Sequence, residues 1–192
     1  MLPLYAVYGV SGFGREVLPM ARAQAAEMGL APDRLVFVDD GADVAVVNGY
    51  RVLGFEAFLH TPASDRFAVL AIADATVRQR LAARLADAGV RPWQVRAAQS
   101  VVMDDVALGE GAILCPFVTL TSNIRIGQHF HANLYSYVAH DCVIGDFVTS
   151  MGGYYAVLFT AMAMVFVAGM ILESLPVTII LAINTKLYAG FG

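Results

Sequence analysis

The sequence is poor in cysteine and in net positive charge. It contains two cysteines, Cys115 and Cys142, which are too few for a disulfide scaffold and lack the paired spacing of a metal site. Its formal charge of -4 excludes a strongly basic surface, so we expect no nucleic-acid partner. Charged residues arrive early, at Arg15 and Glu16, so no secretory signal is visible and we expect a cytoplasmic location.

Charge is scarce in the last part of the chain. Residues 1–150 hold eleven of the twelve basic residues, all of them arginine, and fifteen of the sixteen acids, whereas residues 151–192 hold only Glu173 and Lys186. The mostly apolar stretch 154–172 has nineteen uncharged residues, enough to cross a bilayer as a helix. We therefore expect a hydrophobic helical tail at 151–192, and one interpretation of it is a membrane anchor at 154–172. The other interpretations are a partner helix that covers the end of the preceding structure, and a frameshift or fusion product, which the abrupt loss of charge and the change from arginine to lysine favour.

Residues 102–148 carry an apolar repeat with a period of six. Glycines also return at intervals of eighteen, at Gly109, Gly127 and Gly145. The sixfold positions are all aliphatic: Val102, Leu108, Leu114, Leu120, Ile126, Ala132, Val138 and Ile144. A chain that winds around a triangular prism has this period, whereas a helix or a hairpin does not. We predict a short parallel β-helix of fewer than three coils that loses its register at Ser150, with an irregular antiparallel sheet as the alternative.

Residues 1–97 alternate between strand and helix patterns. Buried-strand candidates lie at residues 4–8, 35–38 and 67–72, and helical segments follow the first and the last of them. This alternation predicts an α/β fold with a small, mostly parallel sheet. We expect a solvated helix face for three arginines of the helix at residues 77–88, namely Arg78, Arg80 and Arg84.

Two groups of residues in this first part are candidates for nucleotide binding. Gly9, Gly12 and Gly14, here called the glycine turn, follow the first strand with the spacing G-x-x-G-x-G. Such glycines let a ligand approach the backbone, and the helix N-terminus beyond them attracts a phosphate. Asp39 and Asp40 follow the second strand, where a nucleotide-binding sheet meets a ribose or a base. For both groups, an ordinary tight turn is the alternative.

His140 is the candidate for proton transfer. Imidazole is the side chain best matched to proton transfer at neutral pH, and the adjacent Asp141 is suited to orient it or to raise its basicity. An exposed histidine without a catalytic role is the alternative. His129 and His131 would face the same side of an extended strand, but the spacing places no third ligand, so no metal is expected.

These motifs occur in the order seen in a known family. The segments that carry the resemblance are Val7 to Val17, Asp39-Asp40, Val52-Leu53-Gly54, Ala71 to Asp74 with Arg78, and His140 to Asp146. Over about residues 4–149, the chain resembles the bacterial sugar acetyltransferases of the sialic-acid O-acetyltransferase and bacillosamine N-acetyltransferase type. The resemblance implies a Rossmann-like domain at 1–97 that binds a nucleotide sugar and a left-handed parallel β-helix of hexapeptide repeats at 98–150 that binds acetyl-CoA. It also implies a homotrimer.

The resemblance further implies roles for single residues. The glycine turn would face the UDP pyrophosphate, and Asp39 and Asp40 would lie near the uridine. His140 would be the general base that takes a proton from the sugar amine or hydroxyl as it attacks the thioester, and Asp141 would orient its ring. Asn133 would contact the substrate or the pantetheine.

We therefore predict an acetyl-CoA-dependent acetyltransferase that acts on a nucleotide-linked amino sugar or a sialic acid in surface polysaccharide biosynthesis. The alternative is a truncated or fused, non-catalytic, membrane-associated nucleotide-sugar-binding protein. This alternative arises because one coil beyond His140 falls on Leu158, inside the apolar stretch, where the family has further coils. A nicotinamide oxidoreductase fits less well, since the glycine turn has the wrong spacing.

Overall fold

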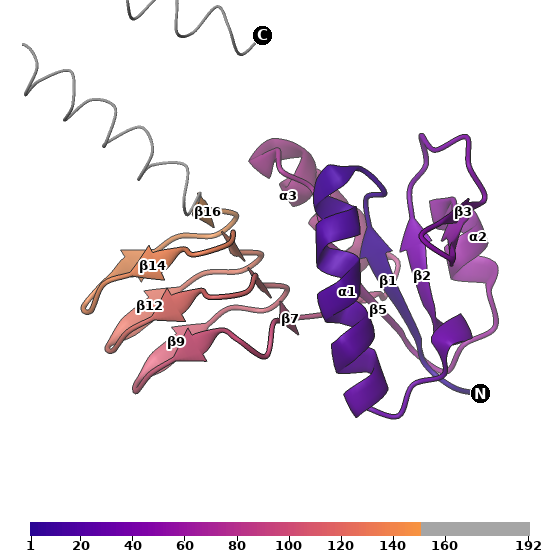
Figure 1. The fold of residues 1–192 in the computed structure, drawn as a ribbon. Helices are drawn as coiled ribbons and strands as arrows, with labels where there is room; N and C mark the ends of the chain where they lie inside the picture. Colours follow the sequence, from indigo (N-terminus) through magenta and orange to yellow (C-terminus); the bar gives the residue numbers. More distant parts are fainter. Residues whose placement is uncertain (151–192) are drawn as a thin grey trace, which may run out of the picture. The chain divides into compact units, whose positions relative to one another are not determined.

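The computed structural model describes residues 1–150, an α/β part followed by a stack of short parallel strands (Figure 1). The predicted tail at 151–192, with its candidate span at 154–172, lies outside the described residues. Within residues 1–150, no helix has both the length and the apolar character needed to cross a membrane.

The first part is a six-stranded sheet with the order β3-β4-β2-β1-β5-β6, parallel except between β3 and β4. The predicted, mostly parallel sheet is thereby confirmed. The strands are β1 (Leu4–Tyr8), β2 (Leu35–Val38), β3 (Val46–Val47), β4 (Tyr50–Leu53), β5 (Arg66–Leu70) and β6 (Arg91–Pro92). The helices are α1 (Gly12–Glu27), α2 (Phe55–His60) and α3 (Ala75–Asp87), and a 3₁₀ turn lies at Pro32–Arg34.

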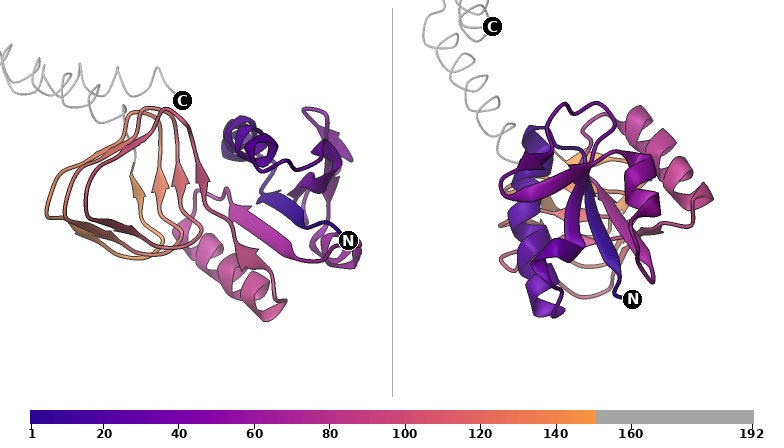
Figure 2. Two further views of the ribbon diagram at one scale, coloured as in Figure 1. Left: turned by 90° about the horizontal axis from the view of Figure 1, so that it is seen from below. Right: turned by 90° about the vertical axis from the view of Figure 1, so that its right-hand side faces the viewer.

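The sheet is covered on both faces because alternate residues of β1 face opposite sides. Ala6 belongs to a buried cluster with Phe58 of α2 and Leu85 of α3. Its neighbour Val7 belongs to a second cluster with Val17 of α1. Figure 2 shows α1 and α3 on opposite sides of the sheet.

The second part is built of parallel strands paired at a spacing of eighteen residues, as in the register Ile113↔His131↔Thr149. Its three sheets have the orders β16-β13-β10-β7, β14-β11-β8 and β15-β12-β9. The strands are β7 (Val95–Arg96), β8 (Val101–Val102), β9 (Val106–Leu108), β10 (Ile113–Leu114), β11 (Thr119–Leu120), β12 (Ile124–Ile126), β13 (His131–Ala132), β14 (Tyr137–Val138), β15 (Val143–Ile144) and β16 (Thr149–Ser150). The pairing confirms the parallel prediction over the antiparallel alternative, and the coils superpose in Figure 2.

Two details of the repeat prediction were wrong. Strands β7 to β15 complete three coils rather than fewer, and β16 continues the register by pairing Ser150 with Ala132. The pairing persists at Ser150 because it uses backbone groups: the Asn133 N–H donates to the Ser150 carbonyl at 3.0 Å. The Ser136 hydroxyl donates to the same carbonyl at 3.1 Å.

The corners of the coils repeat a left-handed backbone conformation every six residues. This conformation costs energy for residues other than glycine. Its φ values lie between +51° and +72° at Asp105, Gly111, Phe117, Asn123, His129, Tyr135, Asp141 and Phe147. Side chains at these corners stack from coil to coil, with ring centroids 4.9 Å apart for Phe117 and Tyr135 and 5.1 Å apart for His129 and Phe147.

The coil stack and the sheet are joined along α1, which lies between them in Figure 1. Val17 of α1 shares one buried cluster with Val95 of β7 and Ile113 of β10. The Gln24 side chain adds polar contacts, because its Nε2 donates to the Gln94 carbonyl at 2.8 Å and its Oε1 accepts from the Arg96 N–H at 3.1 Å. One continuous core therefore holds the nucleotide-binding candidates and the coils together.

Candidate active site

His140 lies on an exposed corner between β14 and β15. Its Nδ1 is 2.6 Å from the Asp141 Oδ2, and the two side chains are 74% and 64% exposed. An ionised carboxylate only accepts hydrogen bonds, so Nδ1 carries a hydrogen atom and donates a hydrogen bond to Asp141. In the neutral ring, Nε2 then holds the free lone pair that a base requires. This geometry fits the predicted roles of both residues.

Asp141 is held in turn by the preceding coil. The Asn123 Nδ2 donates to the Asp141 Oδ1 at 3.2 Å, and the Asp141 N–H donates to the Ser122 carbonyl at 3.1 Å. Hydrogen bonds from His140 and then from Asn123 lower the pKa of Asp141. Asn123 is a residue that the sequence prediction did not include. Its position one full coil, eighteen residues, before Asp141 is the signal that identifies it.

The three residues of the glycine turn have different surroundings. A Cβ on Gly14 would lie 1.8 Å from the Gly9 carbonyl oxygen, and a Cβ on Gly9 would lie 2.8 Å from the Ile72 Cδ1. A Cβ on Gly12 would meet no atom within 4 Å. Gly14 therefore lets α1 approach the end of β1, and Gly9 lets the loop after β5 approach it, whereas Gly12 borders open space. The preceding Ser11 makes no side-chain capping hydrogen bond to α1.

The Asp39 carboxylate organises the glycine turn from the end of β2. Its Oδ2 accepts from the Val10 N–H at 3.0 Å, and its Oδ1 accepts from the Gly41 N–H at 3.0 Å. The Gly9 N–H donates to the Val38 carbonyl at 2.8 Å. These bonds show turn chemistry at Asp39, and its predicted contact with the uridine stays a prediction.

The Asp40 carboxylate connects three elements. Its Oδ1 accepts from the Phe55 N–H at 2.7 Å, and its Oδ2 accepts from the Tyr8 hydroxyl at 3.2 Å and from Arg84 at 2.5 Å. Although partial burial opposes ionisation, the hydrogen bonds from Phe55 and Arg84 hold the pKa of Asp40 below its usual value. Burial, followed by the charge of Asp40, raises the pKa of Tyr8 to about 12.

The predicted solvated arginine face of α3 was wrong at Arg78 and is confirmed at Arg80 and Arg84, which are exposed. Arg78 is fully buried, and its guanidinium bonds to residues of the loop after β5 and of the last coil. Arg84 bonds to Asp40 and lies 3.9 Å above the centre of the Phe55 ring. Arg84 keeps these contacts with its side chain still 42% exposed. Arg78 differs because carbonyl and hydroxyl oxygens of the loop after β5 and of the last coil surround its guanidinium.

His129 and His131 are buried beside Arg78. Burial and then the charge of Arg78 lower the pKa of both rings, to about 3 for His131. Both imidazoles are therefore neutral at neutral pH. His131 lies against Phe13, with ring centroids 5.1 Å apart. Among residues 1–150, no group of three or more His, Cys, Asp or Glu side chains is placed to hold a metal.

Asn133 and His140 lie at different places on the third coil. Asn133 follows β13, on the face that continues to β16, whereas His140 lies between β14 and β15. The Asn133 carbonyl accepts from the Ser136 N–H at 3.0 Å. A role for Asn133 in binding stays a prediction.

Comparisons with known proteins assign the family. The family model of the PglD N-terminal domain matches residues 5–85. GDP-perosamine N-acetyltransferase from Escherichia coli O157:H7 is 43% identical over 150 residues, which are 78% of this chain and 68% of that protein. This chain belongs to the bacterial sugar N-acetyltransferases. The family resemblance predicted from the motifs is thereby confirmed.

Solved structures of sugar N-acetyltransferases and related proteins share the fold. WeeI from Acinetobacter baumannii AYE is 48% identical with a TM-score of 0.74, over 77% of this chain and 68% of that one. PerB from Caulobacter crescentus, solved in complex with CoA and GDP-perosamine, is 26% identical with a TM-score of 0.64, over 76% of this chain and 67% of that one.

Proposed function

We propose that this chain transfers the acetyl group of acetyl-CoA to the amine of a nucleotide-linked amino sugar during surface polysaccharide synthesis. The observation that carries the proposal is the 2.6 Å contact between the His140 Nδ1 and the Asp141 Oδ2 on an exposed corner, with Asn123 bonded behind it. The relative named GDP-perosamine N-acetyltransferase supports the reaction class. The PerB complex with CoA and GDP-perosamine supports the two substrates.

His140 acts as the base through Nε2. The amine nitrogen attacks the thioester carbonyl, so that a C–N bond forms and the C–S bond breaks. The proton lost by the amine passes to Nε2 and then to the departing thiolate, which leaves as the CoA thiol. Asp141 keeps Nδ1 protonated and stabilises the imidazolium that forms. Its lowered pKa keeps the carboxylate ionised at neutral pH.

The nucleotide end of the substrate binds beyond the carboxyl ends of β1, β2 and β5, where ligands of open parallel sheets bind. Gly12 and the start of α1 receive the diphosphate, since open space and backbone N–H groups suit an anion there. Gly9 and Gly14 shape this turn. Asp39 and Asp40 border the nucleoside, and Asn133 contacts the substrate or the pantetheine.

The finer architecture is also part of the proposal. We propose that the Rossmann-like domain, predicted at 1–97, is followed by a left-handed β-helix, predicted at 98–150, whose first strand β7 already precedes that boundary. We also propose that the chain forms a homotrimer. Apolar side chains on the face of β8, β11 and β14 and at its corners support the assembly, because water would otherwise cover them. They are Val101, Met103, Phe117, Leu134, Tyr135 and Tyr137, all between 45% and 65% exposed.

The proposed function is tested by incubating the full chain with acetyl-CoA and a GDP- or UDP-linked amino sugar. We expect equal amounts of released CoA thiol and of nucleotide sugar carrying one acetyl group, measured by a thiol reagent and by mass spectrometry. Binding of the nucleotide sugar without thiol release would instead support the non-catalytic nucleotide-sugar-binding alternative. Absence of both binding and turnover would contradict both.

The trimer is tested with Tyr137→Glu, which places a charge on the proposed interface. Burial of an unpaired charge is costly, so we expect sedimentation velocity to show a trimer for the natural chain and a monomer for this variant. Met28→Glu is the matched control, since Met28 is 45% exposed but lies on the Rossmann-like part. A Tyr137→Glu variant that sediments like the natural chain would contradict this assignment of the interface.

A further inference from the structure

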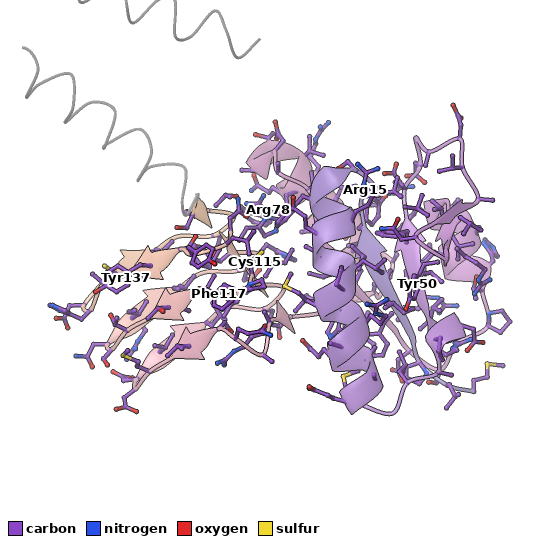
Figure 3. The ribbon with its side chains drawn as sticks, in the orientation of Figure 1. Arg15, Tyr50, Arg78, Cys115, Phe117 and Tyr137 are labelled. Carbon is purple, nitrogen blue, oxygen red and sulfur yellow. The ribbon has the colours of Figure 1, made fainter. Side chains whose placement is uncertain are left out.

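The corner that carries Asp141 holds one polar residue in each of the three coils. Asp105, Asn123 and Asp141, here called the corner ladder, have φ values of +51°, +59° and +60°, which lie in the left-handed region. The strands that follow them, β9, β12 and β15, pair in register, so the three residues lie above one another. Figure 3 shows Tyr137 of β14, the strand before this corner, on the part of the stack that points away from α1.

The lowest residue of the corner ladder is neutralised by an arginine. Both Asp105 carboxylate oxygens accept from the Arg125 Nη2, at 3.0 and 3.1 Å, and the Arg125 Nη1 donates to the Asp105 carbonyl at 2.9 Å. Among the described residues, no arginine or lysine pairs with the uppermost carboxylate, Asp141, whose side-chain partners are His140 and Asn123. The asparagine therefore supplies the donor that an arginine supplies lower in the ladder.

Asn123 and His140 hold different oxygens of the Asp141 carboxylate. The Asn123 Nδ2 donates to Oδ1 at 3.2 Å, and the His140 Nδ1 lies 2.6 Å from Oδ2. The amide nitrogen must face Asp141, since an ionised carboxylate only accepts. Asparagine also tolerates the left-handed backbone of this corner. Aspartate would tolerate the same backbone but would replace the donor with a second acceptor.

We propose that Asn123 is a positioning residue for acetyl transfer, because it fixes the carboxylate of Asp141 that in turn orients the His140 ring. The inference rests on the proposed function, in which His140 is the base. Without the Asn123 donor, the exposed Asp141 side chain gains other rotamers. The ring then loses the Nδ1 hydrogen bond that keeps its lone pair at Nε2. All three side chains belong to one corner of one chain, so this role does not depend on which subunit binds the substrates.

The test compares Asn123→Gly and Asn123→Asp with the natural chain, because glycine and aspartate both tolerate the left-handed backbone. Asn123→Gly removes the donor, and we expect kcat to fall by about 3- to 10-fold, the equivalent of one hydrogen bond. Asn123→Asp places a second carboxylate beside Asp141, and we expect a larger loss of kcat. The acid limb of its pH–rate profile should lie at higher pH, since the added negative charge stabilises the imidazolium.

Asn48→Asp is the matched control. Asn48 is also an exposed asparagine in the left-handed region, with φ +50°, but it lies in the turn between β3 and β4. Its kcat and pH–rate profile should equal those of the natural chain. A second measurement needs no turnover. ¹⁵N NMR of the neutral His140 ring should show mainly the Nδ1–H tautomer in the natural chain and a mixture of both tautomers in Asn123→Gly.

Two results would overturn the positioning role. The first is a natural kcat and pH–rate profile in both Asn123 variants. The second is an unchanged His140 tautomer in Asn123→Gly, which would make any loss of kcat a consequence of structure alone. If Asn123→Asp does not fold, the same measurements on Asn123→Gly decide. If the natural chain itself does not turn over, the proposed function fails, and the tautomer still tests the connection from Asn123 to His140.

Discussion

His140→Ala is expected to lower kcat for acetyl transfer by about 10²- to 10⁴-fold, the usual contribution of a positioned general base. The variant loses the Nε2 lone pair that accepts the proton of the attacking amine. The KM values for acetyl-CoA and the nucleotide sugar should change far less, because the proposed binding groups remain. Steady-state kinetics with continuous detection of the CoA thiol measures both quantities.

His60→Ala is the matched control for this variant. His60 is also exposed, and its Nδ1 lies 2.7 Å from the Glu56 carbonyl oxygen, away from the coils. Its replacement should leave kcat unchanged. His140→Ala should unfold at the same temperature as the natural chain, since the ring is 74% exposed and its burial contributes little. Equal turnover by His140→Ala and the natural chain would contradict the role of this histidine.

Asp141→Asn should have a smaller effect than His140→Ala. The amide removes the negative charge that stabilises the imidazolium, while the imidazole itself stays in place. A loss of kcat smaller than that of His140→Ala therefore supports the assignment of base and orienting group. A loss in Asp141→Asn as large as in His140→Ala would instead indicate that the orientation of the ring governs the rate.

The repeat was predictable because it depends on local chemistry that recurs. Each sixfold aliphatic position from Val102 to Ile144 is the last residue of a strand in β8 to β15. A parallel stack places equivalent residues above one another, so the spacing in the sequence becomes the register in space. The same logic applies to corners such as Asn123 and Asp141, whose hydrogen bond follows from their spacing of eighteen residues.

The interactions across the fold were not predictable in this way. Helix α3 has the pattern of an amphipathic helix with an exposed basic face, and nothing in that pattern distinguishes Arg78 from Arg80. Arg78 is buried and Arg80 exposed because the carbonyl group of Phe147, 69 residues away, reaches Arg78 beside that of the nearby Ile72. The partners of a polar side chain depend on which chain segments the topology brings together, and that information is not local.

The glycine turn was likewise predictable as a motif, whereas the surroundings of each of its glycines were not. Its spacing predicted a close approach of the backbone but not which partner each glycine approaches. Gly14 faces the Gly9 carbonyl, whereas Gly12 faces open space. Gly14 is therefore required by the fold, and Gly12 is the position where a ligand has room. Substitutions at the two glycines should separate stability from binding.

Gly14→Ala is expected to destabilise the chain by about 3 kcal/mol or more, the upper range for overpacking a buried position. The new Cβ would lie 1.8 Å from the Gly9 carbonyl oxygen, a backbone atom that has little freedom to move. Gly9 is itself confined, because its N–H donates to the Val38 carbonyl at 2.8 Å and its φ is +104°. Thermal unfolding should show a Tm lower by roughly 6–12 °C for a domain of this size.

Gly12→Ala is the matched control, because its Cβ meets no atom within 4 Å and alanine favours the first turn of a helix over glycine. Its Tm should equal or slightly exceed that of the natural chain. Its affinity for the nucleotide sugar, measured by calorimetry, should nevertheless fall, since the added methyl group occupies the space proposed for the diphosphate. A Gly14→Ala variant as stable as Gly12→Ala would contradict the packing of α1 on β1. A Gly12→Ala variant with natural affinity would remove Gly12 from the binding site and leave the glycine turn with a structural role only.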